Sequence, residues 1–408
     1  MYDLAAMGAW LEFAVRWLHV ITAIAWIGSS FYFIALDLGL HRDRNLASGA
    51  DGEEWQVHGG GFYHIQKYLV APDQMPGDLI WFKWESYATW LSGFAMLALV
   101  YYLGAEFYLI DPNIADLAPW QAILISMGSL GFGWLAYDRI CKTKFGENNN
   151  RLMVLLFVIL VGMAWFYTQV FTGRAAMLHL GAFTATIMSG NVFFIIMPNQ
   201  RIVVADLIAG RIPDAKYGKI AKQRSTHNNY LTLPVVFLML SNHYPLAFGT
   251  EYTWLIASLV FLMGVTIRHF FNTMHARKGT PYWTWAVTAI LFIIIMWLST
   301  APMFRAEDTE QEVQAGLVHF AQAEGWEDVH DIVMGRCSMC HAAEPFYDGV
   351  LWAPKGVRLD TEAEIIRNAR AVYLQAGLSH AMPPANLSYI EDEERAAIVK
   401  WYEAATSG

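Results

Sequence analysis

The sequence is poor in charged residues and in cysteine. Only 15% of its 408 residues are Asp, Glu, Lys or Arg, while 56% are hydrophobic and 15% are aromatic. Soluble domains typically contain about 25% charged residues, so this composition excludes an ordinary soluble protein. Three cysteines are too few for a disulfide framework, and the first residues lack the basic stretch of a cleaved signal sequence. We therefore expect an integral membrane protein whose first apolar segment is retained as an anchor.

The sequence contains a series of long apolar runs instead. A helix that crosses a bilayer needs roughly 20 mostly apolar residues. Eight segments approach that length: 11–36, 79–102, 119–138, 152–172, 175–197, 228–248, 252–275 and 282–302. Pro234 and Pro245 interrupt the sixth segment, which could be broken or re-entrant. The predicted fold of residues 1–302 is an all-α bundle of eight transmembrane helices, and a weak internal similarity suggests two four-helix halves.

The Lys and Arg residues between these segments are distributed very unequally. Fifteen lie in the first, third, fifth and seventh connections, whereas the other connections contain only Arg174. Because basic loops stay in the cytoplasm, this asymmetry predicts a bacterial inner-membrane protein with both termini in the periplasm. Residues 303–408 hold 18 acidic against 8 basic side chains. Such a domain suits a basic electron-accepting partner, although a soluble surface explains the charge equally well.

Two of the three cysteines belong to the motif Cys337-Ser338-Met339-Cys340-His341. This is the spacing for covalent attachment of a c-type haem. The two thiols reach the two vinyl groups of one porphyrin, and His341 then lies under the iron as an axial ligand. A chance match or a redox Cys-x-x-Cys pair is the alternative. The remaining Cys141 falls in a cytoplasmic connection and is expected to be an inert thiol.

The surroundings of this motif predict a class I cytochrome c domain over residues 303–408, because such domains cross two terminal helices over the haem. Two segments have suitable apolar faces: 309–323 with Val313, Leu317 and Phe320, and 391–405 with Ile398, Trp401 and Tyr402. Between them, Met382 lies on a proline-rich loop 41 residues after His341. We choose Met382 as the sixth iron ligand, with His380 as the competitor. Ligation at both axial positions predicts a haem that transfers electrons and does not activate oxygen.

Polar residues inside the apolar segments fall into two layers. The periplasmic layer contains Arg16, His19, His179, Asn242 and His243, and the cytoplasmic layer contains Lys83, Glu85, Tyr87, Asp138, His227, Asn228, Asn229, Arg268, His269 and Asn272. Polar groups at this depth are costly and mark either a functional site or a hydrogen bond between helices. Both interpretations stay open for each residue.

Three segments resemble one known family. They are Arg16-Trp17-Leu18-His19 through Gly28, Met197-Pro198-Asn199-Gln200-Arg201, and 226–234, and the haem motif follows them in the same order. Over nearly its full length the chain resembles the bacterial membrane-bound urate hydroxylases of the PuuD type. The resemblance implies a urate-oxidising membrane domain fused to a cytochrome c. It also implies that urate is oxidised to 5-hydroxyisourate in purine degradation, with water as the oxygen source.

The resemblance further implies that electrons leave through the haem toward the respiratory chain. A periplasmic cytochrome c or a terminal oxidase is then the expected acceptor. The other expected partners are urate and the lipid membrane, with no nucleic acid. Two other functions stay open: an electron-transfer subunit that oxidises quinol or a partner protein, and a transporter with a redox-sensing tail.

Urate is a planar, electron-rich anion, so its site should contain an Arg fork, amides and a stacking face. We predict in-plane contacts from Arg268, Asn228, Asn229 and Asn272. Glu85, His227 and His269 are the candidates for the general base that takes a proton from the attacking water. These choices place urate in the cytoplasmic layer. The periplasmic layer is the rival location because it is closer to the haem.

Electrons from a cytoplasmic site would have to cross much of a roughly 30 Å hydrocarbon core. His19 and His179 are therefore predicted as the two ligands of a non-covalent b-type haem that relays them. The alternative is that both histidines simply form hydrogen bonds between helices.

Overall fold

The computed structural model describes residues 4–68, 76–111, 114–300, 319–347, 350 and 353–406. The chain divides into two compact units, unit 1 over residues 1–300 and unit 2 over residues 301–408. Both are mostly helical. This division lies within two residues of the boundary expected from the sequence, while the activity assigned to each unit stays a prediction.

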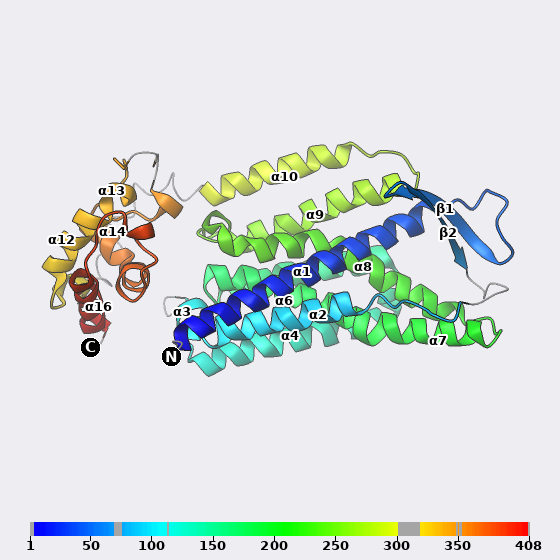
Figure 1. Ribbon diagram of the computed structural model, residues 1–408, viewed down its shortest axis with the longest axis horizontal. Helices are drawn as coiled ribbons and strands as arrows, with labels where there is room; N and C mark the ends of the chain where they lie inside the picture. Colours follow the sequence, from blue (N-terminus) through cyan, green and yellow to red (C-terminus); the bar gives the residue numbers. More distant parts are fainter. Residues whose placement is uncertain are drawn as a thin grey trace. The chain divides into compact units, whose positions relative to one another are not determined.

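Unit 1 is a bundle of helices packed side by side, in which α6 continues into α7 in the same direction (Figure 1). They are α1 (Leu4–Gly39), α2 (Trp84–Leu97), α4 (Pro119–Cys141), α5 (Asn149–Thr168), α6 (Gly173–Gly190), α7 (Met197–Ile208), α8 (Ala215–Leu240), α9 (Thr253–His275) and α10 (Trp283–Thr300). The short α3 (Ala105–Tyr108) lies between α2 and α4 in the chain. A π-helical turn, Ala98–Tyr102, extends α2, and another, Asn191–Ile196, joins α6 to α7. Helices thus occur at all eight positions expected from the sequence.

Five helices of the described chain are long and apolar enough to cross a membrane. They cover Trp10–Gly39, Asn149–Thr168, Gly173–Ile208, Thr253–His275 and Trp283–Thr300. The outward side of α1 exposes large apolar side chains such as Trp10 and Ile24, which suits contact with lipid. Unit 1 is therefore compatible with a multi-pass membrane protein. Eight crossings stay a prediction.

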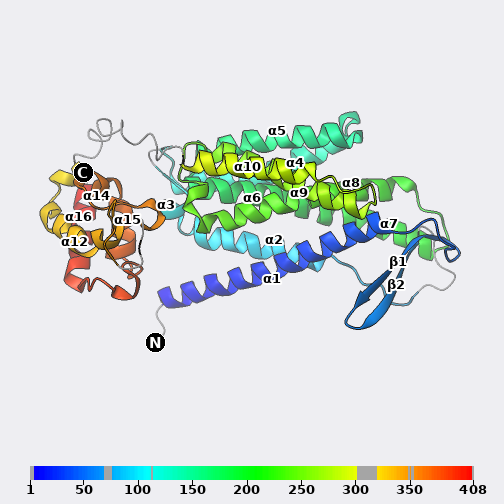
Figure 2. The same ribbon diagram turned by 90° about the horizontal axis from the view of Figure 1, so that it is seen from above.

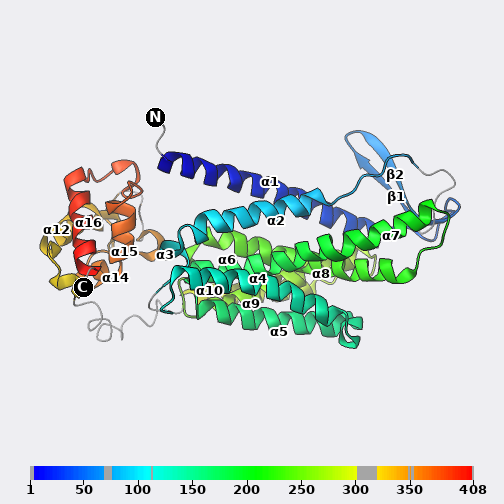
Figure 3. The ribbon, with the colours of Figure 1, turned by 90° about the horizontal axis from the view of Figure 1, so that it is seen from below.

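Helix α6 is the centre of unit 1. It packs against α2, α4, α5, α8 and α9, and most of its side chains are buried. In contrast, α1 lies beside α2 at the edge of the bundle, as the views in Figures 2 and 3 both show. A helix that is apolar all round belongs in such a centre. Polar side chains of α6 consequently face other helices.

The predicted sixth segment, 228–248, has the wrong bounds. Helix α8 begins at Ala215 and ends at Leu240, with Pro234 inside it. The Asp214 side chain caps the helix by accepting a hydrogen bond from the Lys216 backbone N–H. Such a cap lets a helix start within a polar stretch, which hydropathy alone does not detect.

The all-α prediction is wrong for the first connection. Strands β1 (Ala50–His58) and β2 (Gly61–Tyr68) form an antiparallel hairpin there. Gly59 and Gly60 join them with φ angles of +59° and +80°. A Gly-Gly pair permits the mirror-image turn that matches strand twist. This pair was the local signal that could have predicted the hairpin.

The two ends of unit 1 differ in their connections. The hairpin and the turns after α4, α7 and α9 share one end, which we call the basic end. The N-terminus of α1, α3, the turn before α6, the 3₁₀ turn Ser241–His243 and Thr300 share the other, which we call the Thr300 end (Figure 3). The basic connections recognised in the sequence are therefore gathered at one end of the bundle.

Unit 2 is a small helical unit. Its elements are α12 (Trp326–Arg336), α13 (Ser338–His341), α14 (Glu362–Arg367), α15 (Ala369–Val372), a π-helical turn Tyr373–Gly377, and α16 (Asp392–Thr406). The predicted terminal helix is confirmed, because Ile398 and Trp401 of α16 are fully buried and Tyr402 stacks on Tyr373 with ring centroids 4.2 Å apart. Most of the predicted helix 309–323, including Val313 and Leu317, lies outside the described residues. Phe320 packs against Trp401.

Candidate functional site

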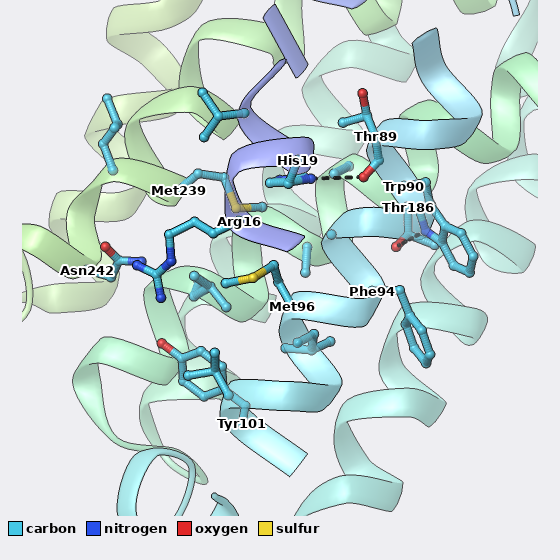
Figure 4. A pocket seen from close by; sticks show the side chains of 18 of the residues that line it. Arg16, His19, Thr89, Trp90, Phe94, Met96, Tyr101, Thr186, Met239 and Asn242 are labelled. Carbon is cyan, nitrogen blue, oxygen red and sulfur yellow. Dashed lines mark hydrogen bonds between the residues drawn. The ribbon is translucent and has the colours of Figure 1, made fainter. Parts of the chain in front are cut away.

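A cavity of about 220 Å³ lies between α1, α2, α6 and the end of α8. Much of its wall is apolar: Trp26, Trp90, Phe94, Met96, Leu178 and Met239. Figure 4 shows Arg16 and Asn242 on one side and Trp90 and Phe94 on the other. The volume is below the roughly 300–1,000 Å³ of sites for drug-sized ligands. The cavity therefore suits a small ring compound.

The polar part of the wall belongs to the Thr300 end. Arg16 begins the lining on α1, Tyr101 comes from the π-helical turn after α2, Arg174 from the first turn of α6, and Asn242 from the turn after α8. Tyr101 Oη, Arg174 Nε and Asn242 Oδ1 are buried and have no hydrogen-bond partner among the described residues. An unsatisfied buried polar atom costs about 1–3 kcal/mol. Three such atoms around one cavity are what a polar ligand would satisfy.

The two arginines at this end differ in whether an acidic side chain neutralises them. Arg16 forms an ion pair with Glu12, one helical turn earlier. The guanidinium carbon of Arg174 instead lies 5.3 Å from the ring centroid of Tyr108, a cation–π contact. Its positive charge also attracts the nearby Tyr101 hydroxyl, but the two groups do not have the geometry of a hydrogen bond. Arg174 is thus the cation with more capacity left for a ligand.

His19 is held in one orientation on the cavity wall. Its Nδ1 lies 3.0 Å from the Thr89 carbonyl oxygen and 3.1 Å from Ser92 Oγ. Because a carbonyl can only accept, Nδ1 carries the proton and Nε2 of the neutral ring is left as an acceptor. A Cβ at Gly93 would approach His19 Cε1 to 2.8 Å, so the glycine makes room for this ring.

His179 has a different environment. It is fully buried, its Nδ1 donates to the Ala175 carbonyl at 2.8 Å, and its ring packs against Tyr101, Tyr167 and Phe171. It is not part of the cavity wall that His19 lines. The described contacts of the two imidazoles therefore differ, and the b-type haem expected between them stays a prediction.

Three of the four predicted urate contacts lie together at the basic end. Arg268 donates to Asn229 Oδ1 at 3.3 Å and to Asn272 Oδ1 at 3.0 Å, and Asn272 Nδ2 donates to Asn229 Oδ1 at 2.9 Å. The guanidinium carbon of Arg268 lies 3.9 Å from the ring centroid of Phe31. The three side chains thus bond one another, although Asn229 Nδ2 has no partner among the described residues, and we call them the Arg268 cluster.

The structure does not bring Asn228 to this cluster. Its side chain bonds Asn191 and the Met188 carbonyl because neighbouring residues of a helix point about 100° apart. Asn191 also accepts from Arg224, which pairs with Asp138 at 2.9 Å. These residues, with Tyr137 and His227, form a second polar group, the Arg224 network.

The three predicted bases lie in three different places. His227 belongs to the Arg224 network, and its Nδ1 is 2.7 Å from Tyr137 Oη. Glu85 lies in the first turn of α2, where its Oε2 is buried without a hydrogen-bond partner in the described chain. His269 is exposed on α9, with its ring 6.1 Å from that of Trp283. The described contacts do not join any of the three to another.

Unit 2 has features that fit a covalent haem. Cys337 and Cys340 are free thiols, and burial raises the pKa of Cys337 to about 12 and also raises that of Cys340. A redox-active pair requires a lowered thiol pKa, so this environment opposes the redox alternative. His341 Nδ1 donates to the Val357 carbonyl at 2.7 Å, which leaves Nε2 for a metal. Met382 packs against the core, whereas His380 is exposed.

Several cavity residues were not selected from the sequence. Tyr101, Trp90 and Thr186 are ordinary residues of apolar helices, so no local pattern distinguishes them. Arg174 did have a signal, because it is the only basic residue in the connections of the Thr300 end. A charge that opposes the general asymmetry of a membrane protein is a candidate for a functional role.

The bundle defines a helical, membrane-compatible protein that contains a small cavity with a polar end. The family model described as urate oxidase N-terminal matches residues 5–299, which is nearly all of unit 1. The chain belongs to this family, and the family indicates an oxidation of urate. Comparisons with curated proteins and with solved structures return no match.

Proposed function

We propose that unit 1 binds urate in the cavity at the Thr300 end and oxidises it to 5-hydroxyisourate, and that unit 2 takes up the electrons through a covalent c-type haem. The observation that supports this site is the set of three unsatisfied polar atoms on its wall. The reaction is balanced as urate plus water giving 5-hydroxyisourate, two protons and two electrons. The respiratory chain is the final oxidant.

The lining residues are complementary to urate. Arg174 Nε and the Tyr101 hydroxyl donate to urate oxygens, and Asn242 Oδ1 accepts from a ring N–H. Trp90 and Phe94 stack with ring centroids 5.5 Å apart, and Trp90 Nε1 donates to Thr186 Oγ1 at 3.2 Å. This bond holds the indole in one orientation. The site thus combines cationic donors with a rigid aromatic wall for a planar anion.

His19 is the general base of the proposed reaction. Loss of two electrons makes the purine ring electrophilic, and the attacking water must then lose a proton. The Thr89 carbonyl keeps the Nδ1–H tautomer, so His19 Nε2 takes that proton. This assignment replaces Glu85, His227 and His269, since none of these lines the cavity.

Unit 2 supplies the electron exit. Cys337 and Cys340 would attach the porphyrin, and His341 and Met382 would supply the two iron ligands. When bound there, a c-type haem with two protein ligands transfers one electron at a time and keeps no open position for oxygen. The Val357 carbonyl orients His341, and the core packing of Met382 keeps its thioether away from solvent.

The charge asymmetry supports a location in a bacterial inner membrane. The basic end then faces the cytoplasm, and the Thr300 end and unit 2 face the periplasm. The cavity is near the periplasmic surface in this orientation, so no second haem is required to carry electrons across the bilayer. A periplasmic cytochrome c or a terminal oxidase is the next acceptor.

The test is anaerobic mixing of the purified full-length chain with urate while the haem absorbance is recorded. Urate alone should reduce the haem, and 5-hydroxyisourate should accumulate at one molecule per two electrons. Reduction by a quinol but not by urate would overturn the proposal in favour of an electron-transfer subunit. A pyridine-haemochrome spectrum should show one covalent haem and no b-type haem.

A further inference from the structure

Arg395 occupies an unusual position in unit 2. It lies near the start of α16 and is only 4% exposed. Its Nη1 donates to three backbone carbonyls, those of Ala376 at 2.6 Å, Met382 at 2.9 Å and Ser379 at 3.3 Å. A buried guanidinium is very costly unless its hydrogen bonds are made. Breaking the hydrogen bonds between Arg395 and these three carbonyls would therefore be costly, so the carbonyls stay attached to α16.

These carbonyls belong to the segment that contains the proposed axial methionine. The Met382 backbone N–H donates to the Gln375 carbonyl at 2.8 Å, so Met382 is held both through its own N–H and through its carbonyl. Its side chain packs against the core of unit 2. His380, two residues earlier, is exposed. The same segment thus offers two iron ligands, and the Arg395 contacts favour the one that points inward.

We propose that Arg395 is the positioning residue that selects Met382 over His380 as the sixth ligand of the haem. The inference rests on the proposed c-type haem in unit 2. A thioether binds iron weakly and keeps its place only when the loop around it is ordered. Without Arg395 the loop from Ala376 to Met382 loses its three hydrogen bonds to α16, and His380 can turn inward to replace the sulfur.

The test uses the ferric spectrum of the full-length chain, in which a methionine ligand gives a charge-transfer band at the red end of the visible range. Arg395→Gln should reduce the population with this band about tenfold, the effect of losing a charge-assisted hydrogen bond. The reduction potential should fall, because histidine replaces methionine. Adding His380→Ala to Arg395→Gln should restore part of the band.

Arg336→Gln is the matched control. Arg336 also binds a carbonyl, that of Ser388 at 3.1 Å, and it pairs with Glu394 at 3.0 Å, but it does not contact the Met382 segment. Its variant should unfold more easily and keep the band. Arg395→Lys, which keeps the charge, should keep part of the band and decides the question if Arg395→Gln does not fold.

The outcomes separate the inference from the proposed function. If the Arg395→Gln variant shows the same charge-transfer band as the wild type, the role of Arg395 is overturned and the haem proposal stays intact. The same conclusion follows from an unchanged band in Arg395→Lys if only that variant folds. A wild-type chain with covalent haem but no band overturns both the Met382 ligand and the selection by Arg395. A wild-type chain without covalent haem overturns the proposed function of unit 2 and the inference with it.

Discussion

The two ends of unit 1 both contain arginine, histidine and asparagine, but in different states. At the basic end, Arg268 is bound by Asn229 and Asn272, and Arg224 is bound by Asp138 and Asn191. At the Thr300 end, Arg174 and Asn242 line a cavity with polar atoms that have no partner among the described residues; Arg224 Nε is also without a partner there but does not line this cavity. The first arrangement links helices to one another, and the second leaves polar atoms facing a cavity.

This contrast shows why residue type alone does not locate a site in a helical bundle. Isolated polar atoms also occur at the basic end, such as His227 Nε2 and Asn229 Nδ2. These two atoms belong to residues that line neither cavity, whereas Glu54 Oε2 and His275 Nδ1, which are also without a partner among the described residues, line a second cavity at the basic end. A binding site needs both unsatisfied atoms and space beside them.

The largest expected effect is that of His19→Ala. Loss of a general base should lower kcat by about 10²–10⁴-fold with little change in KM. His227→Ala is the control at the basic end, because its ring is held by Tyr137, and it should keep most of the turnover. Steady-state urate oxidation measures both. The reverse result, an inactive His227→Ala and an active His19→Ala, would move the reaction to the basic end.

Arg174→Gln should raise the dissociation constant of urate by about 10–100-fold, the range for one charge-assisted hydrogen bond to an anion. Arg268→Gln removes a guanidinium from the basic end and should lower stability while leaving urate affinity nearly unchanged. Equilibrium binding of urate to the reduced chain, which cannot oxidise it, gives the dissociation constants of both variants. Equal losses in the two variants would remove the distinction between the ends.

Gly93→Ala should reduce turnover about tenfold, because the new methyl group displaces the His19 ring, which it would approach to 2.8 Å. Gly28→Ala on α1 is the control, since a Cβ there would meet nothing within 4 Å. The measurement is kcat with urate for both variants. Wild-type turnover in Gly93→Ala would show that the orientation of His19 is not critical.

The smallest effect concerns a fully partnered ion pair in unit 2. Burial raises the pKa of Glu394, but the Glu391 backbone N–H and Arg336 lower it by more, so the pKa lies below its usual range. The resulting stability is present above the unfolded pKa and is lost as pH falls through the folded one. Glu394→Gln should therefore cost about 1 kcal/mol or less at neutral pH.

This cost should vanish at a pH below the folded pKa of Glu394. Thermal unfolding followed by haem absorbance at both pH values tests the expectation. A difference between Glu394→Gln and wild type that persists in acid would mean that the pair stabilises by packing and not by charge.

Much of the architecture follows from local sequence signals. Hydropathy predicted a helix at each of eight positions where the structure has one, but it misplaced the bounds of α8 because a capped polar stretch extends that helix toward Ala215. The hairpin was missed although Gly59 and Gly60 marked its turn. The inner face of α16 was predicted correctly because its apolar spacing is a local property of one helix.

The sequence by itself determined the helical, membrane-compatible character of unit 1, the one-sided distribution of its basic connections and the spacing of Cys337, Cys340 and His341. Each of these depends on neighbours along the chain. Only the tertiary structure decided that Asn228 and Asn229 join different groups and that Arg174 meets Tyr101 and Asn242 at one cavity. The reason is that a helix turns each residue about 100° from the last, and what it then faces depends on helices distant in sequence.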